Sequence, residues 1–164
     1  MIKTRRPVAE DIPALIEFQR EGWFQDYRDI IPVGYAEYAM GLYGTTDALR
    51  RQIERDNLYL VVEDEGAVVA CATAEILNAD EAELWWIHTT KSHRGRGIGR
   101  QLVDEIKHQL TGKVPTLCVT TFQDYTPTLA FYKRLGFSIQ KTYIYEAQGF
   151  SIPKVRLFKS IAHC

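Results

Sequence analysis

The sequence predicts one mixed α/β (α+β) domain over residues 1–164, with a central, mixed, mostly antiparallel sheet and helices on both of its faces. Two observations predict this class. Stretches with helical spacing of apolar residues alternate with stretches rich in valine, isoleucine and small residues. The 164 residues, 46% of them hydrophobic, are enough to bury one core without a metal or a disulfide.

The N-terminal third predicts a short strand followed by helices. Residues 2–6 alternate and are stopped by a proline, which is typical of a first strand. Asp11 is expected to cap a helix. Two further helices are expected after a break at residues 31–34, one over residues 35–42 and one that opens at Thr46. The first helix buries the apolar face formed by Ile12, Leu15, Ile16, Gln19 and Trp23.

The middle third predicts the centre of the sheet. From Asn57 the period changes, and residues 58–62 and 67–76 form a β-hairpin. The next strand starts near Ala82. It contains four consecutive large apolar residues, Leu84-Trp85-Trp86-Ile87, which is typical of a central strand covered on both faces.

The C-terminal half predicts two more helices and three strands. Residues 117–121 form a buried strand, Thr126 is expected to cap a short helix that contains Pro127, and residues 137–145 and 152–159 form a final pair of strands. The other helix precedes the strand at residues 117–121 and ends at Gly112. Its apolar stripe is Ile98, Leu102, Val103, Ile106 and Leu110.

Composition excludes several classes of partner. A formal net charge of −1 argues against a nucleic-acid binder that relies on bulk electrostatics. Cys71, Cys118 and Cys164 are scattered, with neither a disulfide framework nor a metal spacing. There is no signal-peptide pattern and no apolar run of membrane-spanning length. We therefore expect a cytoplasmic protein without a metal, a nucleic-acid partner or a membrane partner.

One stretch predicts an anion site. A strand leads into Arg94-Gly95-Arg96-Gly97-Ile98-Gly99 and then into a helix. The first N–H groups of a helix lack intrahelical partners, and the helix dipole favours an anion there. Arg94, Arg96 and Arg100 are expected to add mobile positive charge. The glycine spacing and the Gly99-Arg100-Gln101 ending match neither a dinucleotide fingerprint nor a Walker A loop.

The stretch resembles the acyl-CoA signature of the GNAT superfamily of N-acetyltransferases, Arg/Gln-x-x-Gly-x-Gly/Ala, through Arg94, Gly97 and Gly99. Residues 129–137, Leu-Ala-Phe-Tyr-Lys-Arg-Leu-Gly-Phe, resemble the second motif of the family. The resemblance covers nearly the whole chain. It implies a GNAT-like fold and transfer of an acetyl group from acetyl-CoA to a primary amine by direct attack. The alternative is a non-catalytic acyl-CoA-binding sensor or interaction module.

The resemblance also implies the residues that hold the coenzyme. Backbone N–H groups around Arg96 to Arg100 would bind the pyrophosphate, and the main chain of Ile87 to Thr89 would bind the pantetheine arm. Where the family often has an asparagine, this chain has Thr126, whose hydroxyl is also available to cap the helix. The implied cofactor-binding residues are Ile87, His88, Thr89, Arg94, Gly95, Arg96, Gly97, Ile98, Gly99, Arg100 and Thr126.

The implied catalytic residues are Tyr132, Glu83 and His88. Tyr132 would be the general acid, and the alternative is a core tyrosine; an ordinary tyrosine pKa makes protonation of a thiolate uphill by about 2 kcal/mol. Glu83 would be the base through a water, or else an exposed carboxylate at the strand end. His88, the second candidate base, lies on the opposite face of a regular strand from Glu83, although a bulge would change this. His93 is expected to be a surface residue.

The acceptor is expected to be a small-molecule amine or a peptide N-terminus. Aromatic and acidic residues cluster on the segment that walls the acceptor site in this family, where they could hold a cationic amine by charge and cation–π contact. An aromatic core with a solvated acidic rim is the equal alternative. The exposed final strand also allows a homodimer. The candidates are Trp23, Tyr27 and Tyr35, with Phe24, Asp26, Asp29 and Tyr38 beside them.

Overall fold

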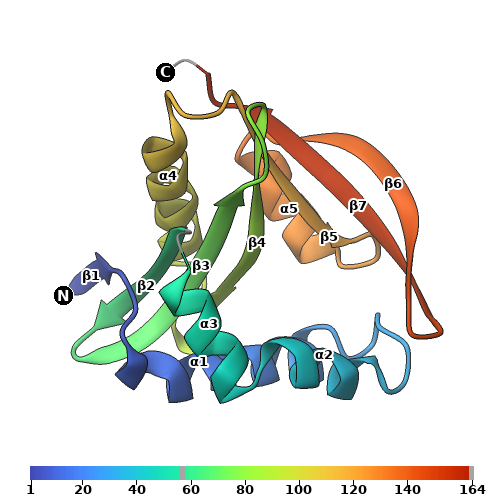
Figure 1. The fold of residues 1–164 in the computed structure, drawn as a ribbon, viewed down its shortest axis with the longest axis horizontal. Coiled ribbons are helices and arrows are strands. Elements are labelled where there is room, and N and C mark those ends of the chain that lie inside the picture. Colours follow the sequence, from blue (N-terminus) through green and yellow to red (C-terminus); the bar gives the residue numbers. More distant parts are fainter. Residues whose placement is uncertain (56–57, 163–164) are drawn as a thin grey trace.

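Within residues 1–55 and 58–162, which the structure describes, seven strands form one sheet in the order β1-β2-β3-β4-β5-β7-β6 (Figure 1). The structure is a computed structural model. β4 and β5 run parallel and the other neighbouring pairs are antiparallel, which confirms the predicted mixed, mostly antiparallel sheet. Predictions that involve Asn57 and Cys164 lie outside the described residues. The strands are β1 (Ile2–Arg5), β2 (Leu58–Asp64), β3 (Ala67–Ile76), β4 (Glu81–Thr89), β5 (Thr116–Phe122), β6 (Ser138–Ala147) and β7 (Phe150–Ser160).

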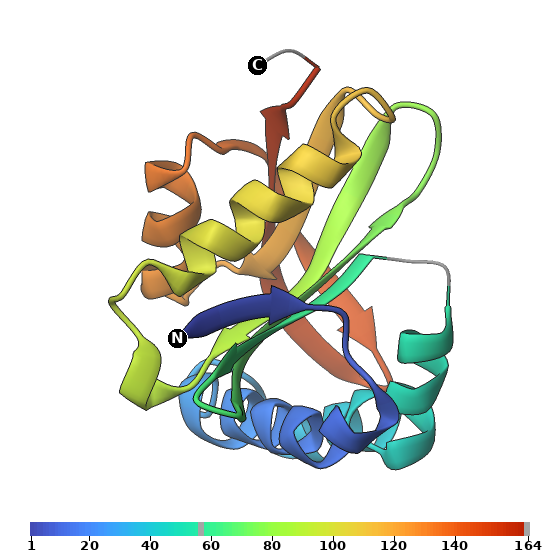
Figure 2. The same ribbon diagram turned by 90° about the vertical axis from the view of Figure 1, so that its left-hand side faces the viewer.

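Helices cover both faces of the sheet, as the sequence predicts (Figures 1 and 2). α1, α2 and α3 pack on one face, and α4 and α5 pack on the other. The predicted apolar stripe of α4 is buried along its whole length. No helix in the described part of the chain is long and apolar enough to cross a membrane. The helices are α1 (Ile12–Glu21), α2 (Tyr35–Tyr43), α3 (Thr46–Glu54), α4 (Ile98–Leu110) and α5 (Thr126–Arg134), and a π-helical turn at Gly22–Asp26 continues α1.

The two predicted capping side chains do not cap their helices. Asp11 holds the N-cap position of α1 as predicted, but it also closes a 3₁₀ turn, and its carboxylate accepts from Val8 N at 2.8 Å and from both Nη atoms of Arg5 at 2.8 and 3.0 Å. Thr126 is the first residue of α5 rather than its cap, and the cap position belongs to Tyr125. Among the described residues, neither helix receives a side-chain cap.

β4 contains a bulge that overturns two expectations. Leu84 and Trp86 pair with adjacent residues of β3, so Trp85 is extra and its side chain is 54% exposed instead of covered. Because the bulge adds one residue to β4, Glu83, Trp86 and His88 all face the side of the sheet that carries α1 and α2. A regular strand would have separated Glu83 from His88. Their β3 partners are Glu75, Thr73 and Cys71, which alternate along one face.

β4 and β5 part from each other just after the bulge. Their parallel pairing runs from Glu81–Thr116 to Leu84–Val119, whereas β4 continues to Thr89 and β5 to Phe122. Beyond Leu84 the β4 edge that faces β5 is therefore left without ladder hydrogen bonds from the described part of β5. The sheet therefore opens between β4 and β5 beyond Leu84, at the end of β4 that leads to the turn at residues 94–97.

The Arg5–Asp11 pair gives the fold a pH dependence. Arg5 lowers the pKa of Asp11 below its ordinary value, so the pair stabilises the fold above about pH 4 and this contribution is lost as the pH falls through the depressed pKa. Asp11→Asn should lower the free energy of unfolding at pH 7 by about 1–3 kcal/mol. Urea unfolding at pH 7 and pH 3 should then show a smaller loss between the two pH values for the variant than for the wild type.

Asp29→Asn is the matched control, because the Asp29 side chain is 88% exposed and its stability profile should follow the wild type. An Asp11→Asn variant as stable as the wild type at pH 7 would contradict the prediction.

Candidate active site

The N-terminus of α4 is open for an anion. Gly97 precedes the helix at φ +82°, and the first intrahelical bond runs from Gln101 N to Gly97 O at 3.0 Å. No side chain among the described residues caps this end, so the N–H groups of residues 98–100 have no intrahelical partner. Packing explains the glycine at position 99, because a Cβ there would lie 3.2 Å from Cζ of Phe131. We call this helix end, with the turn at residues 94–97, the cradle, and its geometry suits an anion.

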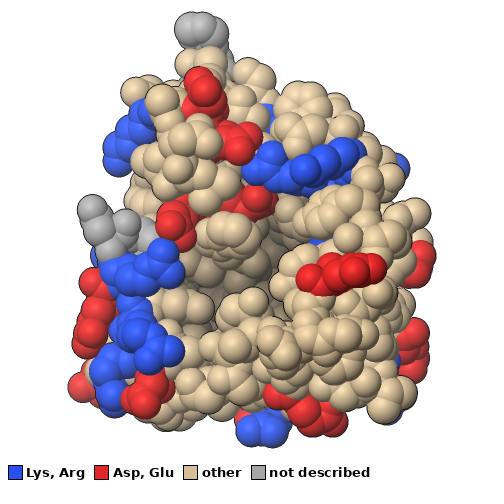
Figure 3. Space-filling view, turned by 45° about the vertical axis from the view of Figure 1, so that its right-hand side comes forward, with Lys and Arg blue, Asp and Glu red and all other residues tan. Residues whose placement is uncertain are grey.

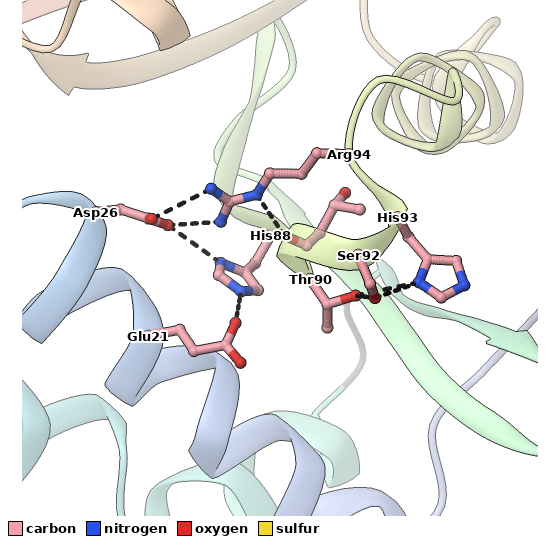
Figure 4. A network of polar contacts seen from close by, with 8 residues as sticks. Glu21, Asp26, His88, Thr90, Ser92, His93 and Arg94 are labelled. Atoms are coloured by element: carbon pink, nitrogen blue, oxygen red, sulfur yellow. Dashed lines mark hydrogen bonds and ion pairs between the residues drawn. The ribbon is translucent and has the colours of Figure 1, made fainter.

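The arginines at the cradle differ from the prediction. Arg94 is not mobile: its two Nη atoms donate to the carboxylate of Asp26 at 2.8 and 3.2 Å, and its Nε donates to Thr89 O at 2.8 Å (Figure 4). A bidentate fork of this kind fixes the side chain. Arg94 thus ties the turn to the π-helical turn after α1, and the exposed side chain of Arg100 is left to supply mobile charge at the cradle.

A cleft of about 550 Å³ lies between the residue 94–97 turn, the end of β4 and α5. We call it the turn cleft. Arg96 and Thr126 are not among its lining residues, and Thr126 is exposed. Of the predicted coenzyme residues, those that line it are Ile87, His88, Thr89, Arg94, Gly95, Gly97, Ile98, Gly99 and Arg100. The other lining residues, which the sequence analysis did not assign to the coenzyme, are Asp26, Tyr27, His93, Tyr125, Pro127, Thr128, Phe131, Arg134 and Leu135.

A second cleft, of about 540 Å³, opens between α1 to α3 and the β6–β7 hairpin. We call it the aromatic cleft. Figure 3 looks onto a hollow in this face, floored by uncharged side chains and bordered by charged ones. Tyr27, Ile87 and Thr128 line both clefts. The two clefts therefore meet at the place where β4 and β5 part.

The structure divides the expected acceptor residues. Trp23, Tyr27 and Tyr35 line the aromatic cleft, whereas Phe24 and Tyr38 do not. The acidic half of the expectation is wrong. Asp26 lines the turn cleft and is paired with Arg94, and Asp29 lies in solvent beside Arg28.

Tyr132 lies on α5 with its side chain at the aromatic cleft. The residue is 1% exposed and packs edge-on against the rings of Phe131 and Phe137. Burial, with smaller contributions from Tyr27 and Glu83, raises the pKa of its hydroxyl well above the ordinary value. The phenol is thus fully protonated at neutral pH, and giving up its proton costs more than the sequence-based expectation of about 2 kcal/mol.

Glu83 is a buried ion-paired carboxylate, not an exposed strand end. It is 3% exposed, and its Oε1 accepts from Arg156 Nε and Nη2 at 3.2 and 3.1 Å. Its Oε2 is buried without a hydrogen-bond partner among residues 1–55 and 58–162. Burial raises the pKa of Glu83 despite the opposing effect of Arg156. Such an oxygen is a strong acceptor for a proton or a water.

His88 belongs to the turn cleft and is already engaged. Its Nε2 lies 2.8 Å from Glu21 Oε2 and its Nδ1 lies 3.9 Å from Asp26 Oδ2 (Figure 4). Burial lowers the pKa of its imidazole, while Glu21 opposes the shift. His93, expected at the surface, is half-buried and bonds Asp64 through Nε2 at 2.9 Å.

The β6–β7 hairpin supplies a wall of the aromatic cleft that the sequence analysis missed. Tyr143 and Tyr145 lie two residues apart on β6, and Lys154 lies on β7. The two-residue spacing of the tyrosines was the sequence signal that could have placed them on one face of the strand. Nothing in the spacing indicated that this face would turn toward α1 and α2. Glu75 and Arg55, paired at 2.9 Å, close the cleft from β3 and the end of α3.

Solved structures similar to this chain include three N-acetyltransferases. One is the PaiA N-acetyltransferase of Thermoplasma acidophilum in complex with coenzyme A, with a TM-score of 0.79, 21% identity, and coverage of 94% of this chain and 98% of that chain. Another is the ribosomal-protein-S18-alanine N-acetyltransferase of Escherichia coli, with a TM-score of 0.73, 17% identity and 100% and 96% coverage. The third is an N-acetyltransferase of Staphylococcus aureus Mu50, with a TM-score of 0.75, 16% identity and 98% and 99% coverage.

At these identities the three structures establish the fold. The sequence model of the acetyltransferase (GNAT) family matches residues 14–137. This match takes in the cradle, the parting strands and the helix that carries Tyr132, and it spans well over half of the 164 residues. The chain belongs to the acetyltransferase (GNAT) family.

Proposed function

We propose that the protein transfers the acetyl group of acetyl-CoA to a primary amine by direct attack. Family membership makes it an acetyl-CoA-dependent acyltransferase. The observation that carries the direct route is the pair of clefts that meet where β4 and β5 part, with the anion cradle on one side and Tyr132 on the other. Cys71 and Cys118 are buried and burial raises the pKa of both thiols, which argues against an acyl-enzyme.

The turn cleft fits the coenzyme. Acetyl-CoA supplies an activated acetyl thioester and carries a pyrophosphate. The unpartnered N–H groups at the start of α4 suit that pyrophosphate, with Arg100 and Arg134 on the cleft wall for its charge. The main chain of Ile87 to Thr89, on the β4 edge that β5 has left, offers hydrogen bonds to the pantetheine arm and to the developing oxyanion. The PaiA structure, which has the same fold, is a complex with coenzyme A.

The two proton transfers fall to Tyr132 and Glu83. The amine nitrogen forms the new C–N bond as the C–S bond breaks; the amine loses a proton through a water to Glu83, and Tyr132 donates its proton to the departing sulfur. The raised pKa of Tyr132 requires donation to be concerted with C–S cleavage, when the sulfur becomes basic. Glu83 is favoured over His88 because Glu83 keeps one unpartnered oxygen among the described residues, whereas His88 is bonded to Glu21 in the turn cleft.

Release of free thiol from acetyl-CoA tests the proposal. Purified protein mixed with acetyl-CoA and a broad panel of primary amines should release coenzyme A faster than the protein without an amine, with an N-acetylated product detected by mass spectrometry. Coenzyme binding without thiol release from any amine would instead support the non-catalytic sensor.

The cradle predicts that Gly97→Asp abolishes coenzyme binding. The new carboxylate would stand at the unpartnered N–H groups of α4, where it would exclude the pyrophosphate by bulk and charge. Calorimetry with coenzyme A should show at least a 10²-fold weaker Kd, an order-of-magnitude expectation for a lost phosphate site. Gly112→Asp is the matched control: Gly112 also has a positive φ, +84°, in open space, but at the other end of α4. Equal losses in the two variants would place the phosphates elsewhere.

The role of Tyr132 as general acid predicts that Tyr132→Phe lowers kcat by about 10²-fold or more, because the sulfur then leaves without a proton. The Kd for coenzyme A, measured by calorimetry, should stay near the wild-type value. Tyr59→Phe removes an equally buried hydroxyl from a core cluster outside both clefts and should leave kcat unchanged. Wild-type turnover in Tyr132→Phe would remove this residue from the mechanism.

The role of Glu83 as base predicts an acidic limb in the pH profile of kcat/KM. Below its raised pKa Glu83 is protonated and accepts no proton, so kcat/KM should fall as the pH decreases through that pKa. Glu83→Gln should lower kcat/KM by about 10²-fold and flatten this limb. Glu81→Gln is the control, since Glu81 also pairs with Arg156 at 3.3 Å while its own pKa is lowered by that arginine. A limb that survives in Glu83→Gln would assign the base to another group.

A further inference from the structure

The aromatic cleft contains a cation with no ion-pair partner. The half-buried side chain of Lys154 lines the cleft from β7, with its Nζ 4.1 Å from the ring centre of Tyr145 and 5.6 Å from that of Phe122. Lys154 forms no ion pair with a carboxylate in the described part of the chain. Ring contacts offset part of the cost of removing an ammonium group from water, and a carboxylate would offset more.

The carboxylates near Lys154 are committed to other cations. Burial lowers the pKa of Lys154 and the charge of Glu83 opposes this shift, but Oε1 of Glu83 is bonded to two nitrogens of Arg156. Glu75 is the one carboxylate among the described lining residues of the cleft, and it pairs with Arg55 at 2.9 Å. Two cations and one carboxylate therefore line the aromatic cleft, which leaves it with a surplus positive charge at Lys154.

This charge is the opposite of what a cationic amine needs. Asp26 and Asp29, the residues expected to attract such an amine, do not line this cleft. A fixed cation repels a second ammonium group and lowers the pKa of a bound amine, which favours the neutral nucleophile. The rings of Trp23, Tyr35 and Phe122 provide an apolar wall beside the cation.

We propose that the acetyl acceptor is a small primary amine that carries a carboxylate and an apolar side chain, as an apolar amino acid does, and that Lys154 binds its carboxylate. The proposal rests on the acetyl transfer proposed above and specifies the acceptor class for the same site. Lys154 acts as the carboxylate anchor, the aromatic rings contact the apolar side chain, and the amine is directed toward the gap where the two clefts meet.

The test compares matched acceptors that differ in one group. L-phenylalanine, L-phenylalaninamide and 2-phenylethylamine share the ring and the amine, and leucine with leucinamide forms a second set. Thiol release with acetyl-CoA should give a kcat/KM at least about tenfold higher for each acid than for its counterpart without a carboxylate, which corresponds to about 1.4 kcal/mol for one desolvated ion pair.

Lys154→Met should bring the ratio of kcat/KM for the acid to kcat/KM for the acceptor without a carboxylate close to one, because it removes the charge and nearly keeps the length of the side chain. Lys154→Arg should retain most of the preference for the acid. Lys141→Met is the matched control: Lys141 is an exposed lysine of the same hairpin, with its Nζ 5.3 Å from the ring centre of Tyr143, and it does not line the cleft. Its ratio should equal that of the wild type.

A binding measurement separates this proposal from the acetyl transfer itself. With coenzyme A present, N-acetyl-L-phenylalanine should bind by calorimetry more tightly than N-acetyl-2-phenylethylamine, and Lys154→Met should abolish the difference. Amines without a carboxylate that are acetylated as well as the acids, with no change in Lys154→Met, would overturn the anchor and leave acetyl transfer intact. If no amine is acetylated, acetyl transfer falls, and equal binding of the two N-acetyl compounds would overturn the anchor as well.

Discussion

The site depends on one constraint, the short pairing of β4 with β5. The two strands pair from Glu81 to Leu84 and then part, because the bulge at Trp85 shifts the phase of β4. The bulge places Glu83 and His88 on one face of the sheet, and the opening leaves the β4 edge without a strand partner and lets the two clefts meet. A regular, fully paired strand would have closed the sheet and left no passage between the cradle and the aromatic cleft.

A network of polar contacts connects the two sides of this opening. Arg94, at the start of the cradle, grips Asp26 with both Nη atoms, and Asp26 lies 3.9 Å from His88, which in turn bonds Glu21 (Figure 4). Because the π-helical turn that ends at Asp26 also brings Trp23 and Tyr27 to the aromatic cleft, one set of charged contacts positions walls of both clefts. The signature arginine is therefore structural as much as electrostatic.

Charge is distributed unevenly between the two clefts. The turn cleft contains the N-terminus of α4 and Arg100, whose positive charge suits phosphates. The aromatic cleft contains Lys154, which is surrounded by aromatic rings. Glu83, which is not among the lining residues of either cleft, is bonded to Arg156 through one of its two oxygens, and Tyr132 lines the aromatic cleft, buried with its pKa raised. Low polarity around Glu83 and Tyr132 strengthens any hydrogen bond they make to reacting atoms, and it also makes each proton transfer depend on close coupling to bond changes.

The sequence by itself determined the architecture and the cradle, because both are recorded in local patterns. The apolar stripe of α4, the valine and small residues of β3 and the glycines before Ile98 depend on neighbours within a turn or a strand, and each has the predicted structure. Only the tertiary structure decided which charges meet. Asp11 turned toward Arg5, Asp26 toward Arg94 and Glu83 toward Arg156, partners that lie 6, 68 and 73 residues away. Lys154 reached the aromatic cleft through the curvature of a hairpin. Ion pairing over such separations depends on how the sheet and helices pack, and no local spacing records it.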